Sequence, residues 1–409
     1  MNVLFISDNF PPESNAPASR LHEHARHWVR AGHRVTVLTG APNFPEGKVY
    51  PGYQNRWHQT ESVDGIRVVR VKTYMAANEG FFGRTLDYLS FMGMSVAAGA
   101  FERRPDVLVA TSPQFFAAIG GAGLGVLRRV PFVLEVRDLW PASIVAVGAM
   151  RDGPIIDALH RLELALYRQA AAVIVVTESF RADIVARGIA REKIHVVPNG
   201  ADSSWCAPRP RDQSFTDEHE LDGKFVVGYF GTHGMAHGLE RVLDAAELLS
   251  DEPAVAFIFA GAGAERAQLE ASVARRRLGN VRLVPRQPKQ RMPVLWSACD
   301  VALIPLRADP VFAGVIPSKL FEAMAHGVPS VISVPEGEAT ALVRETGAGV
   351  VVPPEDPAAL AAAIRELSRS PERLGELGAR ALAAAPRFSR QQQAERMLAV
   401  LERVVRCSA

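Results

Sequence analysis

Two side chains of opposite charge stand three residues apart at the start of one predicted helix. Lys319 and Glu322 lie in the run Ser318–His326, which is rich in alanine and follows Gly314 and Pro317. At this spacing both side chains lie on one face of a helix, near the end whose unpaired amides and dipole attract anions. Lysine neutralises phosphate, and glutamate accepts two hydrogen bonds from a diol. The pattern predicts a site for a ligand with phosphates and sugar hydroxyls; a solvated surface ion pair is the alternative.

Two glycine loops in the second half of the chain are further candidates for contact with a nucleotide. The loop Gly231–Gly234 separates a predicted strand from a predicted helix, where backbone amides can approach a phosphate. His233 and Thr232 are candidate donors there, and a simple turn is the alternative. The loop Gly261–Gly263 lacks the third glycine of a dinucleotide fingerprint, which argues against a nicotinamide site. Arg286 follows the next strand and is either a donor contact or a solvated side chain.

The first half carries its own candidate pair at a strand end. Arg137 and Asp138 directly follow the predicted strand Phe132–Glu135. They are either functional groups at the edge of a sheet or a buried ion pair. Trp140, two residues later, is suited both to stacking on a sugar ring and to anchoring this loop in the core.

Short β-branched runs alternate with helical stretches along the whole chain, which predicts an α/β fold with parallel sheets covered on both faces. Strands are predicted at Val3–Ile6, Arg34–Leu38, Ile66–Lys72, Val107–Ala110, Phe132–Glu135, Val173–Val176, Phe225–Tyr229, Ala256–Phe259, Val281–Val284, Val301–Ile304, Ser330–Ile332 and Gly349–Val351. Helices are predicted at Ala18–Ala31, Asp157–Ala171, Gly238–Leu249, Ala264–Arg276, Pro288–Ala298, Ser318–His326, Pro357–Ser368, Glu372–Ala384 and Ser389–Val405. The length of 409 residues and the Pro/Arg run Ala207–Arg211 indicate two domains.

Composition and charge narrow the class of protein. Apolar content of 48% and charged content of 22% are ordinary for a globular protein, and a net charge of +2 argues against a nucleic-acid partner. Three scattered cysteines favour a reduced cytoplasm over a disulfide framework or a zinc site. The N-terminus is not expected to be a signal peptide, because Asp8 and two prolines interrupt its apolar run.

Two apolar segments of the first half are too short to span a membrane but are unusually apolar for surface helices. Leu89–Phe101 ends at the charged run Glu102–Arg104, and Phe115–Leu127 is followed by two arginines. With Phe81, Phe82 and Arg84 just upstream, they predict an apolar, arginine-fringed surface for anionic lipid. Buried helices of the N-terminal domain are the alternative.

Five motifs in a fixed order resemble those of retaining glycosyltransferases of family 4. They are Val3–Ile6 with the loop Asp8–Pro17, Val196–Asp202, Gly228–Gly234, Phe257–Gly263 and Pro317–Pro329. The segments Phe10–Pro17, Arg137–Pro141 and Gly231–Gly234 resemble a narrower branch of bacterial surface-polysaccharide and O-antigen enzymes. That branch includes transferases of N-acetylated deoxyamino sugars such as N-acetylfucosamine.

The resemblance implies the GT-B fold, with two Rossmann-like, doubly wound parallel-sheet domains facing across a cleft. Residues 1–205 would bind the acceptor, with the terminal helix 389–409 packing back on them, and residues 206–388 would bind the donor. The catalytic residues implied are Asp138, Lys319 and Glu322. The donor-binding residues implied are Gly231, Thr232, His233, Gly261, Gly263, Arg286, Ile316, Pro317, Ser318, Lys319 and Glu322. The acceptor-side residues implied are Glu13, Asn15, Ala16, Arg137 and Trp140.

The chain departs from the family in two places. Gly314 stands eight residues before Glu322, where the family often has a second glutamate that touches the donor sugar. Thr232, His233 and His237 stand where the family often has an arginine and a lysine for the diphosphate, so Lys319 is expected to hold the phosphates.

The resemblance also implies how such an enzyme would work. It would be metal-independent, take a UDP-linked sugar, and pass it to a polyprenyl-diphosphate-linked acceptor at the inner face of the cytoplasmic membrane. No double-displacement nucleophile is visible, so a same-face substitution assisted by the leaving phosphate is preferred, with Asp138 orienting or deprotonating the acceptor hydroxyl. The rival functions are a nucleotide-sugar epimerase on the same fold and a non-catalytic sugar- or lipid-binding subunit.

Overall fold

The chain folds into two compact units. The computed structural model describes all residues except 14, 45–46, 76–80, 113, 147, 149, 152 and 409, and the predicted lipid contacts Phe81, Phe82 and Arg84 have side chains outside the described part. Unit 1 comprises Met1–Pro198 and Arg390–Ala409, and unit 2 comprises Asn199–Ser389. The chain therefore leaves unit 1 at Pro198, a few residues before the Pro/Arg run.

Unit 1 is built, over its described residues, on an eight-stranded sheet in the order β3-β4-β2-β1-β5-β6-β7-β8. All neighbouring strands are parallel except the antiparallel pair β3 and β4. The strands are β1 (Asn2–Ile6), β2 (Arg34–Gly40), β3 (His58–Val63), β4 (Ile66–Val71), β5 (Val107–Thr111), β6 (Phe132–Val136), β7 (Ala172–Val175) and β8 (Ile194–Val196). The order reverses at β1, which lies between β2 and β5, and ligands of such sheets bind at that point.

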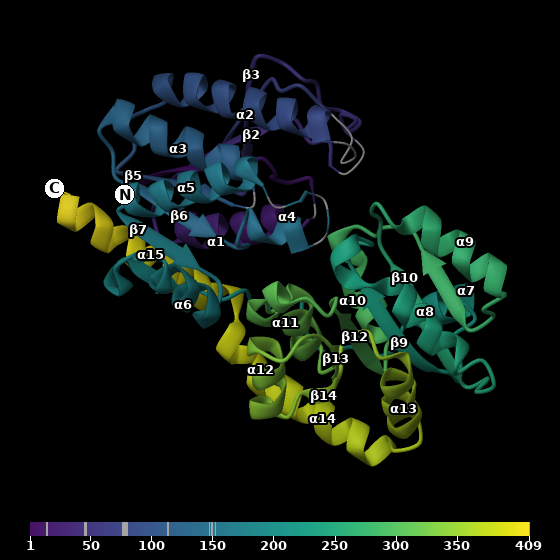
Figure 1. Cartoon of the computed structure of the whole chain (residues 1–409). Coiled ribbons are helices and arrows are strands. Elements are labelled where there is room, and N and C mark those ends of the chain that lie inside the picture. The colour runs from purple at the N-terminus through teal and green to yellow at the C-terminus, as the bar shows by residue number, and fades with distance from the viewer. Residues whose placement is uncertain are drawn as a thin grey trace. The chain divides into compact units, whose positions relative to one another are not determined.

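Helices cover both faces of this sheet (Figure 1). They are α1 (Ala16–Arg30), α2 (Phe81–Phe101), α3 (Phe115–Arg128), α4 (Ala142–Ala146), α5 (Pro154–Gln169), α6 (Glu178–Ala186) and α15 (Arg390–Ser408). α1 and α15 share one core with alternate residues of the strands, and the indole of Trp28 donates to the carbonyl of Ala394 at 2.9 Å. α2 and α3 pack side by side on the opposite face, where Gly121 fits against Ala110 and Phe132.

Unit 2 repeats the plan with a six-stranded, fully parallel sheet in the order β11-β10-β9-β12-β13-β14 over the described residues. Its strands are β9 (Phe225–Phe230), β10 (Val255–Ala260), β11 (Val281–Val284), β12 (Val301–Pro305), β13 (Ser330–Ser333) and β14 (Gly349–Val352). Its helices are α7 (Gln213–Glu218), α8 (Leu239–Glu247), α9 (Arg266–Arg276), α10 (Met292–Ser297), α11 (Ser318–Ala325), α12 (Glu338–Thr346), α13 (Pro357–Ser368) and α14 (Pro371–Ala384). The order reverses at β9, so the loops after β9 and β12 flank the expected ligand position.

The predicted strands are all present, and the elements that the sequence analysis missed are either polar or short. β3 alternates polar residues on an antiparallel edge and buries little, so it lacks the apolar run by which the other strands were found. The remaining missed elements are short: β8, α4, α6, α7 and α12 have three to nine residues. Among the described residues, no helix is both long enough and apolar enough to cross a bilayer.

Two buried ion pairs hold α1 to the two segments at which the chain leaves unit 1 and returns to it. Arg20 donates to Glu135 at 2.8 Å and to the backbone carbonyl of Pro198 at 2.7 Å, where the chain leaves the unit. Glu23 accepts from Arg390 at 2.5 Å, where the chain returns as α15. All four side chains are at least nine-tenths buried, so each charge depends on its partner.

Glu135→Ala is expected to lower the free energy of unfolding of unit 1 by about 3–5 kcal/mol, because Arg20 keeps its charge in the interior. Burial opposes ionisation of Glu135, but Arg20 and Arg137 hold its pKa below the usual value. The stabilisation is therefore present above about pH 4 and lost in more acidic solution. Urea unfolding at neutral and acidic pH measures it. Arg67→Ala, which removes an exposed pair with Glu102, is the control, expected to change the value by less than about 1 kcal/mol. Equal losses in the two variants would contradict the prediction.

Candidate active site

Lys319 holds a buried ammonium group at the strand-order reversal of unit 2. It lies in the first turn of α11, which begins at Ser318 without a side-chain cap. Its Nζ lies 3.8 Å from the ring centroid of Tyr229 and beside Gly231, where a Cβ would approach it to 3.3 Å. Although the side chain as a whole is half-buried, the nitrogen is buried and has no hydrogen-bond partner among the described residues. Burial lowers the pKa of Lys319 to about 7, which Glu322 partly opposes. A buried cation that makes no hydrogen bond within the described part of the chain suits a phosphate site.

The ring of Tyr229 packs against this ammonium, and the sequence analysis did not single this residue out. The side chain is fully buried at the end of β9, and its hydroxyl donates to the carbonyl of Thr232 at 2.5 Å. Burial raises the pKa of Tyr229, so the phenol stays protonated and neutral. Its ring face attracts the cation above it. A tyrosine two residues before a glycine loop, in a strand otherwise made of phenylalanine, valine and glycine, was the available signal.

The predicted donor-binding glycines Gly261 and Gly263 are required by contact between two loops of unit 2. A Cβ on Gly261 would lie 1.8 Å from the carbonyl oxygen of Gly231, and one on Gly263 would lie 2.4 Å from that of His233. The amide of His233 donates to the carbonyl of Ala262 at 2.9 Å, which joins the loops. These glycines therefore hold the loop Gly231–Gly234 in place, and their contact with a ligand stays a prediction.

Two histidines replace the cations that the family often has here, and both are neutral at pH 7. Burial, Arg266 and Lys319 lower the pKa of His233 to about 4, and both its ring nitrogens are buried without a hydrogen-bond partner among the described residues. Burial and Lys319 lower the pKa of His237 to about 3, and its Nδ1 lies 3.2 Å from the carbonyl oxygen of Pro305. His233 can offer a hydrogen bond but no positive charge, so Lys319 supplies the charge beside this loop.

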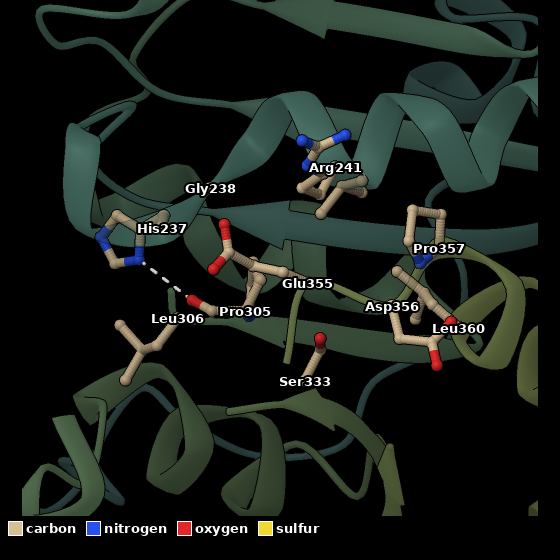
Figure 2. Close-up of a pocket in the computed structure, with 11 residues that line it drawn as sticks. His237, Gly238, Arg241, Pro305, Leu306, Ser333, Glu355, Asp356, Pro357 and Leu360 are labelled. Atoms are coloured by element: carbon tan, nitrogen blue, oxygen red, sulfur yellow. Dashed lines mark hydrogen bonds between the residues drawn. The ribbon is translucent and has the colours of Figure 1, made fainter. Parts of the chain in front are cut away.

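A small hollow beside His237 is lined in part by the side chain of Glu355 (Figure 2). One oxygen of Glu355 accepts from the amide of Ala308 at 2.8 Å, and Ser333 and Arg241 lie on other sides of the hollow. Its free volume of about 10 Å³ is near the minimum for one water molecule. The hollow is therefore too small for a nucleotide sugar, and His237 acts here as a brace for the glycine loop.

The remaining donor-side candidates differ in how close they lie to Lys319. Glu322 is half-buried one turn along α11, and its carbonyl accepts from the ring of His326 at 2.9 Å. Thr232 is exposed in the glycine loop. Arg286 is half-buried after β11, two strands away from β9 and so on the order of 10 Å distant. The half-buried residues Ile316, Pro317 and Ser318 form the approach to α11.

Unit 1 places Asp138 and Arg137 at the carboxyl end of β6. One oxygen of Asp138 accepts from the hydroxyl of Ser143 at 2.9 Å, and burial raises the pKa of Asp138. Arg137 donates to the backbone carbonyl of Ser112 at 3.2 Å and lies 3.9 Å from Glu135. The arginine is thus paired with Glu135, and Asp138 keeps a pKa that burial raises above its usual value.

The acceptor-side loop candidates have structural partners of their own. Glu13 is buried and accepts from three backbone amides, those of residues 10, 43 and 44. Asn15 caps α1 by accepting from the amide of Ala18 at 3.1 Å, and Ala16 begins that helix. Trp140 stacks on Phe115 with ring centroids 4.4 Å apart, which anchors its loop. Of these, Glu13 is enclosed by the protein and shapes the loop without presenting its carboxylate.

Sequence reasoning also missed two acids of unit 1. Burial raises the pKa of Asp8, with smaller effects from Asp87 and Glu13, and burial raises the pKa of Asp87 to about 7. Asp8 follows β1, and Asp87 lies near the start of α2, so these helix and strand ends meet at the carboxyl edge of the sheet. Among the described residues, no group of three or more histidines, cysteines or acids is placed to hold a metal ion.

Comparison with known families decides the class of enzyme. The glycosyl transferase 4-like domain family matches residues 15–200, and the glycosyl transferases group 1 family matches residues 210–383. The chain is a glycosyltransferase. This glycosyltransferase is 27% identical over 376 residues to the colanic acid biosynthesis glycosyl transferase WcaI of Escherichia coli, covering 90% of this chain and 92% of that protein. It is 29% identical over 306 residues to the glycosyltransferase WbjE of Pseudomonas aeruginosa, covering 74% and 72%.

Solved structures identify the fold of this glycosyltransferase as GT-B. Sucrose-phosphate synthase from Thermosynechococcus elongatus superposes with a TM-score of 0.79 at 19% identity, covering 99% of each chain. Anabaena HepE in complex with UDP and glucose superposes with a TM-score of 0.74 at 20% identity, covering 98% of this chain and 99% of that one. The predicted pair of parallel-sheet α/β domains is thereby confirmed.

Proposed function

We propose that this glycosyltransferase moves a sugar from a UDP-linked donor to a polyprenyl-diphosphate-linked saccharide in cell-surface polysaccharide synthesis. WcaI is named for colanic acid biosynthesis, and HepE was solved with UDP and glucose, which supports this substrate class. The enzyme acts at the inner face of the cytoplasmic membrane. Its sugar is an N-acetylated deoxyamino sugar of the N-acetylfucosamine kind, as in the O-antigen branch that the loop motifs resemble.

The buried ammonium of Lys319 carries the proposal. In glycosyl transfer the departing nucleoside diphosphate gains negative charge, and a preorganised cation at that point lowers the barrier. Nζ lies over Tyr229 and beside Gly231 at the switch point of unit 2, without a hydrogen-bond partner in the described part. Unit 2 therefore binds the donor, with Lys319 on the diphosphate and Glu322 on the ribose diol.

Unit 1 binds the acceptor in this proposal, and the sugar keeps its anomeric configuration. The acceptor hydroxyl oxygen attacks the sugar on the same face from which the diphosphate departs. As the bond between sugar and diphosphate breaks, the leaving diphosphate oxygen takes the proton of that hydroxyl. Asp138 orients the hydroxyl, and its own carboxylate is held by the hydroxyl of Ser143, which donates to one oxygen at 2.9 Å. Charge on the diphosphate is met by Lys319 and the amides at the start of α11, so we propose a transfer without a metal ion.

A nucleotide screen tests the donor half of the proposal. Thermal shifts are recorded with UDP, GDP, ADP and TDP, followed by turnover of UDP-sugars with polyprenyl-diphosphate saccharides in the presence of EDTA. Stabilisation by UDP above the others, with transfer that needs acceptor, is the expected result. Donor consumption without acceptor would instead identify an epimerase, and no shift with any nucleotide would identify a non-catalytic subunit.

Asp138→Asn is expected to lower kcat by at least about 10²-fold. The carboxylate can accept from Ser143 and from the acceptor hydroxyl at different oxygens, whereas the amide has only one oxygen. The wild-type rate should fall as pH drops through the raised pKa of Asp138, and the variant should lose that limb. Transfer rates from pH 5 to pH 8 measure both. Ser143→Ala, which removes the hydroxyl that donates to Asp138, is the companion variant and should shift the limb to higher pH. A variant with wild-type kcat would remove Asp138 from the mechanism.

A further inference from the structure

α2 presents an apolar stripe to the outside of unit 1. Between Thr85 and Phe101 the helix has a single charged residue, Asp87, which is half-buried. Leu86, Leu89 and Phe101 are exposed, and Phe101 is 93% accessible. With the exposed small residues at 93 and 97, they recur every three or four positions, so they form one face along the helix. The outer face of a surface helix normally carries charged side chains, so an uncharged face is unusual for a helix that contacts water.

α3 extends the stripe at its C-terminal end. Val126 and Leu127 are exposed by 68% and 62%. The guanidinium of Arg128 donates to the carbonyls of Gly99 and Glu102, at 3.2 and 2.9 Å, and so joins the C-terminal ends of α2 and α3. Phe101 and the exposed pair of α3 therefore lie at the same end of two helices that pack side by side (Figure 1).

Exposed arginines border the stripe at this end. Arg103, Arg104 and Arg129 are exposed, and Arg104 donates to the backbone carbonyl of Arg129 at 3.0 Å. The neighbouring acid Glu102 already accepts from Arg67, and Asp106 accepts from the amide of Asn2 at 2.6 Å. The three exposed arginines outweigh the remaining charge of Asp106, so the border has a net positive charge beside a face without charge.

We propose that this α2–α3 face, defined by Leu86, Leu89, Phe101, Val126 and Leu127, rests on an anionic lipid bilayer. Apolar side chains enter the boundary between headgroups and acyl chains, and the arginines of the border contact lipid phosphates. A border of net positive charge selects an anionic surface over a second copy of the same face, whose arginines would repel.

The direction of α2 indicates how the face would serve the enzyme. This step rests on the proposed function. α2 follows β4 and ends before β5, so it runs from the carboxyl edge of the sheet to the amino edge. Asp87 near its start interacts with Asp8 and Glu13 at the carboxyl edge, the same edge that carries Asp138. A bilayer along α2 would thus reach the end of unit 1 where a lipid-linked acceptor is needed.

Co-sedimentation of the full chain with vesicles tests the surface. Wild type should bind phosphatidylcholine vesicles that contain phosphatidylglycerol and should not bind phosphatidylcholine alone. Phe101→Asp should weaken binding by at least about tenfold, and Arg103→Glu with Arg104→Glu by more than about 10-fold, since each arginine is worth roughly fivefold. Leu248→Asp, at an exposed leucine of unit 2, is the matched control and should bind like wild type. Equal binding of all variants, or no binding by wild type, would overturn the proposal.

Two further measurements distinguish this proposal from dimerisation through the same face and from failure of the proposed function. Gel filtration should give one elution volume for wild type and Phe101→Asp, and conversion of a wild-type dimer to a monomer would assign the face to a second copy. Transfer to a water-soluble, short-chain acceptor should be unchanged in Phe101→Asp. If wild type transfers nothing to that acceptor while still binding anionic vesicles, the proposed function fails and the lipid surface stands.

Discussion

Lys319→Met is expected to lower sugar-transfer turnover by about 10²–10³-fold, the usual cost of removing one preorganised group that stabilises developing charge. The ammonium is buried over Tyr229 and beside Gly231, and neither neighbouring histidine is charged at pH 7. Nucleotide affinity should fall selectively, with UDP weakened and uridine unchanged, because only UDP carries the diphosphate. Steady-state transfer and calorimetric titration with the two ligands measure these effects.

The same variant should be more stable than wild type without ligand, which excludes misfolding as the cause of lost activity. Burial lowers the pKa of Lys319 to about 7, so between about pH 7 and pH 10 the unfolded chain binds more protons than the folded one. Wild-type stability should therefore rise with pH across that window, and Lys319→Met should lack this rise. At pH 7 and below, an apolar replacement should add about 1–4 kcal/mol to the free energy of unfolding.

Proton uptake gives a direct signature of the bound diphosphate. The negative ligand favours the charged form of Lys319, so UDP binding above pH 7 should take up a proton, and affinity should fall as pH rises. Titrations in two buffers of different ionisation enthalpy detect this uptake. Lys224→Ala, at the opposite end of β9, is the control and should retain uptake and turnover. Wild-type turnover in Lys319→Met would contradict the assignment.

The sequence predicted the strands and the helix α11 because their signals are local. Continuous apolar runs such as Val301–Ile304 are typical of a doubly covered parallel sheet, and Lys319 with Glu322 stand at a helix start. The neighbour of Lys319 could not be predicted in the same way. Tyr229 reaches it only because β9 pairs with β12, and strand order in a sheet is a non-local property.

Residue type alone also failed to separate ligand contacts from scaffold. Gly261 and Gly263 match a nucleotide loop, but each is required by a close approach of the neighbouring loop. Glu13 lies in a conspicuous polar loop, but it is enclosed and accepts backbone amides from another segment. The charge state of His233 depends on burial, which spacing does not reveal.

Glu322→Gln is expected to remove the preference of the enzyme for a ribose over a deoxyribose nucleotide. In the proposed site the Glu322 carboxylate accepts hydrogen bonds from the ribose diol, and such charged bonds contribute about 1.5–3 kcal/mol. Wild type should therefore bind UDP roughly 10–100-fold more tightly than 2′-deoxy-UDP. The substitution should reduce UDP affinity by a similar factor and leave the deoxy ligand nearly unchanged.

The fold of the variant should be intact, because the bond from His326 to Glu322 uses the backbone carbonyl and is kept by glutamine. Glu366→Gln on α13, an exposed acid of the same unit, is the matched control and should retain the full preference. A cycle of two proteins and two ligands isolates the contact from general weakening, since only a direct interaction makes the two changes non-additive. Additive effects would place the diol elsewhere and would leave the assignment of Lys319 to the diphosphate unchanged.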